Sequence, residues 1–331
     1  MKYYNGERFL IDGRIMSSEK RKYAYNRLPD MYKSTLRKEL WDLSKNSSGV
    51  AIKFITDSTC ISVKWSLLNN VSMNHMPDTG IKGVDLYCKS NNGWDYINTG
   101  IPNKKHNEQI LVEKLKRDSR EYVLYLPLYE GTTNVKIGID ENSKIKSEHN
   151  SLNPIIFYGT SLTQGGCASR PGLSYTNIIS RKLERECVNL GFSGNGHLDE
   201  SIGEILSKID TAAFVIECLA NLNIDMIQKK TIPLVKTIRK EKPTTPIIFV
   251  EQCEIKSGFH KELKEHIIKN NIELSKQLRL MKNENIKEIY LINDNNILNN
   301  ESTVDGLHFN DIGSMRYANY FVNEIKKLNI L

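Results

Sequence analysis

The sequence has no long apolar run. Its first residues, MKYYNGERFLIDGRIM, mix apolar with polar and charged side chains, unlike the apolar centre of a secretory signal. No later segment offers the roughly 20 consecutive apolar residues that a membrane-spanning helix requires. We therefore expect a soluble, cytoplasmic protein with no membrane partner.

Cysteine pairs at metal-binding or redox spacing are also missing. The 6 cysteines are scattered along the chain without a CxxC pair, and several lie in or beside apolar runs, where small buried thiols are common. This pattern favours free thiols over a disulfide framework. It also predicts that the protein holds no metal site.

The chain lacks a block of charge of one sign. Its 46 basic and 39 acidic residues give a formal net charge of +7, but they are mixed, as in KLKRDSREY. Mixed charges of this kind are typical of a solvated surface rather than of a basic patch. We therefore predict no nucleic-acid partner.

What the sequence does contain is two halves with different periodicity. A chain of 331 residues suits two domains. The first half alternates apolar with polar residues, or carries β-branched and aromatic ones, between polar turns. The segments concerned are VAIKFITDS, CISVKWSL, VDLYCKS, DYINTGI, EQILVEKL, EYVLYLPLY and NVKIGID. They predict an antiparallel β-sandwich domain over residues 1–148.

The polar segment KIKSEHNSLNP, which ends at Pro154, separates the halves. After it, continuous apolar strands such as PIIFYG and PIIFVEQC alternate with helical patterns such as ESIGEILSKI. This alternation predicts an α/β domain over residues 149–331, with a parallel sheet covered by helices on both faces. Such sheets bind ligands beyond the carboxyl ends of their strands.

Those strand ends carry the residues of an acyl-transfer site. Ser161 follows the first strand, the turn that contains Gly194 follows the second, and Asn221 follows the third. Asp305 and His308 lie in the loop before the last helix. Since the ends of parallel strands meet at one edge of the sheet, we expect these residues to lie close together.

Their chemistry fits nucleophilic catalysis. A serine hydroxyl attacks a carbonyl carbon when a base takes its proton and a third group orients that base. We predict Ser161 as the nucleophile, His308 as the base and Asp305 as the group that orients it. The amides of Ser161 and Gly194 and the side chain of Asn221 would form the oxyanion hole.

The blocks GTSLTQGG, LGFSGNG, ECLANLN and DGLHF, in this order, resemble the conserved blocks of the SGNH (GDSL-like) lipase and acylhydrolase superfamily. The resemblance implies a flavodoxin-like three-layer α/β/α catalytic domain and the same roles for the residues named above. The segment GVDLY, Gly83 to Tyr87, resembles the GxDLY signature of a β-sandwich domain that precedes the catalytic domain in one branch of that superfamily.

The sequence departs from the superfamily's pattern at two places. Thr160 stands where many members have Asp, and ECLAN replaces the common GxND. These positions shape the pocket, so Thr160 is a candidate for substrate contact. Arg170, in CASRPG, is a second candidate, although an arginine before Pro171 fits a surface position equally well.

Several of these residues also have alternative interpretations. Cys167 is a rival nucleophile, but no histidine is tied to it by spacing. Asn221 could instead cap the helix that follows it. The glycine turn and Glu217 could belong to a nucleotide-binding protein, although the glycine order is GxxGxG rather than GxGxxG. A GxSxG motif is lacking, which disfavours the α/β-hydrolase fold.

These observations predict a serine esterase that needs no cofactor. The resemblance implies that its partner is a small ester, a short acyl group on a carbohydrate or other small polyol rather than a long-chain lipid, since no large apolar lid segment interrupts the second half. The alternative is an acyltransferase that uses the same residues. The connection between the halves is only about ten residues long, so we expect the β-sandwich to pack against the catalytic domain.

Overall fold

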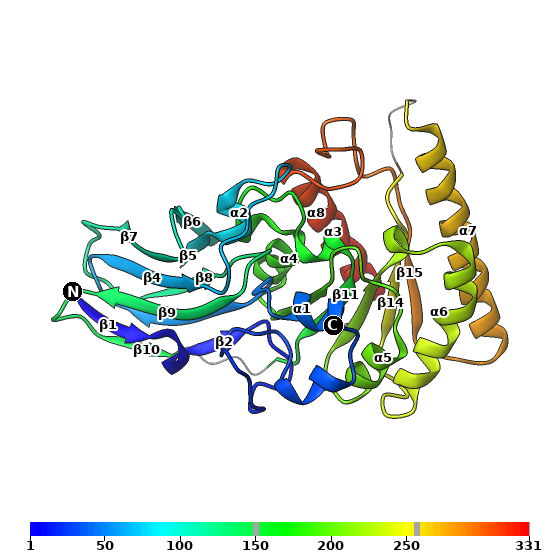
Figure 1. The fold of residues 1–331 in the computed structure, drawn as a ribbon, viewed down its shortest axis with the longest axis horizontal. Helices are drawn as coiled ribbons and strands as arrows, with labels where there is room; N and C mark the ends of the chain where they lie inside the picture. Colours follow the sequence, from blue (N-terminus) through cyan, green and yellow to red (C-terminus); the bar gives the residue numbers. More distant parts are fainter. Residues whose placement is uncertain (148–151, 255–258, 331) are drawn as a thin grey trace.

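The computed structural model describes residues 1–147, 152–254 and 259–330. An antiparallel β-sandwich lies at one end of the molecule and helices α6 and α7 lie at the other, with the short helix α3 between them (Figure 1). The predicted fold class is confirmed. The predicted boundary between residues 148 and 149 lies outside the described residues.

Two antiparallel sheets form the β-sandwich. One has the order β1-β9-β4-β7, and the other has the order β10-β3-β8-β5-β6, with β2 paired to β3. The strands are β1 Lys2–Asn5, β2 Leu10–Asp12, β3 Ala51–Thr56, β4 Ile61–Leu67, β5 Val84–Ser90, β6 Gly93–Gly100, β7 His106–Val112, β8 Arg120–Tyr125, β9 Thr132–Ile139 and β10 Ile145–Ser147. Alternate side chains of both sheets meet in one core that includes Phe54, Trp65 and Tyr122.

A parallel sheet organises the second half. Its strand order is β12-β11-β13-β14-β15, the order of flavodoxin-like folds. The strands are β11 Ile155–Gly159, β12 Cys187–Gly191, β13 Ala213–Glu217, β14 Ile247–Val250 and β15 Ile289–Ile292. Gly159 at the end of β11 pairs in register with Gly191 and Glu217. The carboxyl ends of these strands are therefore level, and the loops after them leave the sheet side by side.

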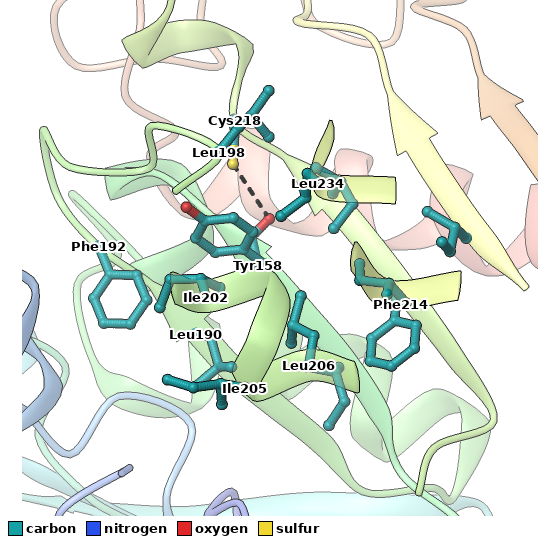
Figure 2. Close-up of a cluster of buried hydrophobic side chains, with 14 of the residues drawn as sticks. Tyr158, Leu190, Phe192, Leu198, Ile202, Ile205, Leu206, Phe214, Cys218 and Leu234 are labelled. Atoms are coloured by element: carbon teal, nitrogen blue, oxygen red, sulfur yellow. Dashed lines mark hydrogen bonds between the residues drawn. The ribbon is translucent and has the colours of Figure 1, made fainter. Parts of the chain in front are cut away.

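Helices cover both faces of this sheet. They are α3 Ser161–Gln164, α4 Tyr175–Leu183, α5 Glu200–Ser207, α6 Ile224–Arg239, α7 Lys261–Asn283 and α8 Asp311–Leu328. Ile156 and Tyr158 pack toward α5, α6 and α7, whereas Ile155 and Phe157 pack toward α4 and α8. Figure 2 shows part of the first of these clusters, in which the thiol of Cys218 lies 3.8 Å from the carbonyl oxygen of Tyr158. The described helices include none that is both long and apolar enough to span a bilayer.

The first half also contributes to the core of the α/β layer, which the sequence analysis did not predict. Before β3, the chain forms a 3-10 turn at Asp30–Ser34, the helix α1 at Lys38–Ser44 and irregular segments. Apolar side chains of this stretch, among them Leu28 and Trp41, belong to the same buried cluster as the helices α5 to α7. Part of the first half thus packs into the core of the second.

Arg27 is the strongest link between this stretch and the parallel sheet. Its fully buried guanidinium donates to the carbonyl oxygens of Asn189 and Gly191, each at 2.8 Å, and to that of Leu43 at 2.7 Å. It lies over the ring of Phe192 at 5.0 Å. Burial lowers the pKa of Arg27 to about 9, so it stays charged at neutral pH. The contacts fix the end of β12, from which the glycine turn leaves.

Candidate active site

Ser161 is the first residue of α3, directly beyond β11. Thr160 is the N-cap residue, and its hydroxyl oxygen accepts a hydrogen bond from the amide of Leu162 at 3.3 Å. Gly165 ends the helix in a left-handed conformation. Of the two hydroxyl residues that follow the apolar strand β11, Thr160 therefore caps the helix, and Ser161 is left with its hydroxyl available for other contacts.

An unbroken chain of hydrogen bonds joins Ser161, His308 and Asp305. The hydroxyl oxygen of Ser161 lies 2.9 Å from Nε2 of His308, and Nδ1 of His308 lies 2.6 Å from Oδ2 of Asp305. The other carboxylate oxygen of Asp305 accepts the amides of Leu307 at 3.0 Å and His308 at 2.8 Å. The loop therefore orients the carboxylate, and the carboxylate orients the imidazole.

The surroundings of Asp305 stabilise the ionised form of its carboxyl group. Partial burial acts to raise its pKa, but the hydrogen bonds from the imidazole and amide of His308 and from the amide of Leu307 outweigh burial and leave the pKa below its usual value. Asp305 is therefore ionised at neutral pH. An ionised carboxylate at Nδ1 fixes the tautomer in which Nε2 can accept the serine proton.

The side chain of Asn221 is held by the glycine turn. Its Oδ1 accepts the amide of Gly196 at 3.2 Å, which leaves its NH₂ group to donate elsewhere. The alternative role as a helix cap is filled by another residue, since Asn223 accepts the amide of Met226 at 2.9 Å and caps α6. Asn221 instead ends a 3-10 turn, Leu219–Asn221, that follows β13.

Gly194 has the backbone conformation that the turn needs. Its φ of 66° lies in the left-handed region, and no atom lies within 4 Å of the position that a Cβ would occupy. The residue is exposed. The structure thus joins Ser161, His308 and Asp305 by hydrogen bonds. Gly194 and Asn221 follow β12 and β13, the strands that neighbour β11, and their part in an oxyanion hole stays a prediction.

A residue far away in the sequence fixes the glycine turn. Arg37 forms an ion pair with Asp199 at 3.1 Å and donates to Oδ1 of Asn195 at 3.0 Å. The third guanidinium nitrogen of Arg37, Nη2, lies 3.3 Å from Nδ1 of His197. No local signal in the sequence marks Arg37, because its partners lie about 160 residues later.

The structure places Thr160 and Arg170 differently from the sequence prediction that they contact substrate. Thr160 is completely buried beneath the site. The guanidinium of Arg170 donates to the carboxylate of Asp85 at 2.8 Å and to the hydroxyl of Tyr87 at 2.7 Å, and it lies over the ring of Tyr96 at 3.8 Å. Arg170 therefore joins the α/β layer to the GxDLY strand of the β-sandwich.

Cys167 is poorly suited to act as the nucleophile. Its side chain is buried, and burial, together with the nearby charge of Asp305, raises the pKa of its thiol to about 11. A thiol with so high a pKa holds almost no thiolate at neutral pH. All six cysteines lie among the described residues, and none of them forms a disulfide. Among the described residues, no group of His, Cys, Asp and Glu side chains is arranged to hold a metal ion.

Glu217 lies beneath Ser161 and has no cationic partner among its described contacts. One carboxylate oxygen accepts the hydroxyl of Thr163 at 2.6 Å and that of Thr160 at 3.3 Å, and Tyr175 is 2.8 Å from the Thr163 hydroxyl. Burial raises the pKa of Glu217 to about 7, against the lowering effect of these hydrogen bonds. A side chain so enclosed is not placed to bind a ribose, which removes the main support for the nucleotide-binding alternative.

The pKa of Glu217 predicts a specific effect of pH on stability. An acid whose pKa is raised by folding binds more protons in the folded than in the unfolded state, so the unfolding free energy falls as pH rises from about 4.5 toward 7. Replacing Glu217 by glutamine keeps the acceptor oxygen and removes this ionisation. Between about pH 5 and 8, the free energy of unfolding of the variant should therefore rise relative to that of the native protein by on the order of 2 kcal/mol. Urea unfolding at several pH values measures this difference. If the unfolding free energies of the two proteins changed with pH in the same way, the raised pKa of Glu217 would be contradicted.

Known proteins share both halves of this architecture. Residues 152–326 match the family model of the GDSL-like lipase/acylhydrolase family, and residues 1–145 match the GxDLY model, the N-terminal part of SGNH-hydrolase-type esterases. No curated protein matches the sequence.

Three solved structures illustrate the range of similarity. A candidate GDSL-like lipase from Bacteroides ovatus has a TM-score of 0.93 at 31% identity, over 98% of this chain and 97% of that chain. The salicylyl-acyltransferase SsfX3 from a tetracycline biosynthetic pathway has a TM-score of 0.81 at 15% identity, over 100% of this chain and 98% of that chain. A family two carbohydrate esterase from Clostridium thermocellum, in complex with cellohexaose, has a TM-score of 0.62 at 14% identity, over 86% of this chain and 94% of that chain.

The last two similarities concern the fold alone. The family match spans more than half of the chain, and the similarity to the Bacteroides ovatus structure covers nearly all of it. The chain therefore belongs to the GDSL-like lipase/acylhydrolase family and is a hydrolase that acts on ester bonds.

Proposed function

We propose that the protein cleaves a short acyl ester through an acyl-serine intermediate. The hydrogen-bonded chain from Ser161 through His308 to Asp305 is the observation that carries this proposal. The hydroxyl oxygen of Ser161 attacks the ester carbonyl carbon while Nε2 of His308 takes the hydroxyl proton. Asp305 stabilises the imidazolium that forms. The imidazolium then protonates the leaving alcohol oxygen, and the carbon–oxygen bond to that alcohol breaks.

The oxyanion of the tetrahedral intermediate would be held by backbone and side-chain donors. The amides of Ser161 and Gly194 and the NH₂ group of Asn221 are the donors that we assign. In the second half of the reaction, His308 takes a proton from water, and the hydroxide equivalent attacks the acyl-serine carbonyl. Collapse of that intermediate releases the acid and returns the proton to Ser161. No step requires a cofactor.

A carbohydrate or other small polyol is the alcohol that we propose. The long connection over residues 293–310, which carries the triad histidine and aspartate, is rich in asparagine and other polar residues. A polar surround of this kind suits a hydroxylated alcohol better than a long acyl chain, which needs a large apolar surface. The fold similarity to carbohydrate esterases, including an acetyl xylan esterase from Butyrivibrio proteoclasticus, is consistent with this choice.

Acyl transfer is the second candidate function. The observation that favours it is the end-to-end similarity of fold to a salicylyl-acyltransferase, at a TM-score of 0.81. The same triad would form the acyl-serine, and the hydroxyl group of an acceptor would take the place of water. Hydrolysis remains our proposal because the family model matched is that of lipases and acylhydrolases.

A series of p-nitrophenyl esters tests the proposal. With the purified protein, kcat/KM should be highest for the acetate and should fall steadily through the butyrate to the octanoate, since a short polar pocket gains little from added methylenes. Adding glycerol or a methyl glycoside and analysing the products by mass spectrometry separates the two candidates. Free acid as the main product supports hydrolysis, whereas an acylated acceptor as the main product supports transfer. A preference for the octanoate would contradict the short-acyl proposal.

A further inference from the structure

A loop of the β-sandwich reaches the histidine of the triad. This loop, residues 68–77, follows β4 and leads into the short helix α2, Asp78–Lys82. The ring centroid of His75 lies 6.1 Å from that of His308, with the two rings inclined by 50°. His75 is exposed, and its Nδ1 lies 3.1 Å from Oδ1 of Asn74. Within the described part of the chain, its Nε2 has no hydrogen-bond partner.

The beginning of this loop is held by a buried carboxylate. Glu130, which follows β8, accepts the amides of Asn69 at 3.1 Å, Asn70 at 2.7 Å and Val71 at 3.0 Å. The ammonium group of Lys82 donates to Oδ1 of Asn70 at 3.2 Å. Hydrogen bonds from successive amides to one carboxylate restrict the backbone, so the loop leaves the β-sandwich in a fixed direction.

The end of the loop is attached to the α/β layer close to Ser161. Met76 is buried, and Gly80 approaches the carbonyl oxygen of Ala168 so closely that no Cβ would fit. The hydroxyl of Thr79 donates to the carbonyl oxygen of Ser169 at 2.6 Å. Both ends are thus fixed, and the position of His75 beside the triad does not depend on an unrestrained loop.

The position of His75 indicates which part of an ester it faces. His308 must reach the leaving alcohol oxygen to protonate it, whereas Gly194 and Asn221 are assigned to the carbonyl oxygen. A side chain beside the imidazole of His308 therefore borders the alcohol rather than the acyl group. We propose that His75 is a specificity-determining residue that binds the alcohol, with its imidazole hydrogen-bonded to a hydroxyl of a carbohydrate or other polyol. This inference rests on the proposed function.

Substitutions of His75 test the inference on two acetates that differ in the alcohol. The first substrate is a monoacetylated methyl glycoside, which has free hydroxyls, and the second is p-nitrophenyl acetate, which has none. His75→Ala and His75→Phe should lower kcat/KM for the glycoside roughly five- to tenfold, mostly through KM, as expected for one lost hydrogen bond. His75→Gln retains hydrogen-bonding capacity and should recover part of this loss. All three variants should lose less on p-nitrophenyl acetate, at most about twofold in kcat/KM, because this ester offers the imidazole no hydroxyl.

The matched control is His106→Ala. His106 is also an exposed histidine of the β-sandwich, in β7, where its Nδ1 lies 2.9 Å from the hydroxyl of Ser66. This variant should behave like the native enzyme on both acetates. Equal losses on both acetates, or no loss on either, in the His75 variants would overturn the inference. A native protein that hydrolyses neither acetate would instead contradict the proposed function, and the inference with it.

Discussion

Replacing Ser161 by alanine should lower kcat for p-nitrophenyl acetate by about 10⁴-fold or more, because a nucleophile and its base act as a unit. The hydroxyl oxygen that lies 2.9 Å from Nε2 of His308 is lost, and no acyl-serine can form. The fold should persist, since Thr160 rather than Ser161 caps α3. The measurement is steady-state hydrolysis, with circular dichroism to confirm that the variant is folded.

The control for this variant is Cys167→Ala. Cys167 lies shortly after the helix α3 that Ser161 begins, but its thiol has a raised pKa and no part in the proposed reaction. Its loss should leave kcat within about threefold of the native value, as for a buried substitution that spares the reacting groups. If Cys167→Ala abolished turnover and Ser161→Ala retained it, the nucleophile would have been assigned wrongly.

Replacing Asn221 by alanine should lower kcat by about 10²- to 10³-fold with little change in KM. The side-chain NH₂ group is free to donate because Oδ1 is held by the amide of Gly196. A donor that acts on the oxyanion stabilises the transition state more than the bound substrate, so its loss appears in kcat. Initial rates over a range of ester concentrations separate the two parameters.

Asn223→Ala provides a matched control for Asn221→Ala. Asn223 lies two residues later and caps α6, so its loss should lower the unfolding free energy by about 1 kcal/mol and leave kcat unchanged. Asn221→Ala should show the reverse pattern. If Asn221→Ala were destabilised but kept its kcat, Asn221 would be a structural residue and the oxyanion hole would need another donor.

The second half of the chain was predictable because its signals are local. Continuous apolar strands such as Ile155–Gly159 alternate with amphipathic helices, and this pattern determines a parallel sheet. Once the sheet is parallel and in register, its strand ends must meet, so residues as far apart as Ser161 and His308 could be placed together. The hydrogen-bonded group of Ser161, His308 and Asp305 follows from this pattern, whereas the oxyanion donors stay a prediction.

The short connection predicted that the two halves pack together, but the residues in contact were not predictable, because nothing near a residue in the sequence identifies a distant partner. Arg27 and Arg37 resemble ordinary surface arginines, yet one is fully buried against β12 and the other holds the glycine turn. Arg170 was a candidate for substrate contact or for the surface, and its actual partner, the buried Asp85, lies 85 residues earlier. His75 gave no signal at all, since an exposed histidine in a polar loop is ordinary in any sequence.

Covalent labelling tests the central claim, an acyl-serine mechanism at Ser161, most directly. The native protein should react with a fluorophosphonate in a one-to-one ratio, lose its esterase activity in parallel, and yield on mass spectrometry a single modified peptide with the adduct on Ser161. The activated hydroxyl next to His308 is the group that such a reagent attacks. An active protein that resists labelling, or one inactivated by an adduct on another residue, would contradict the mechanism.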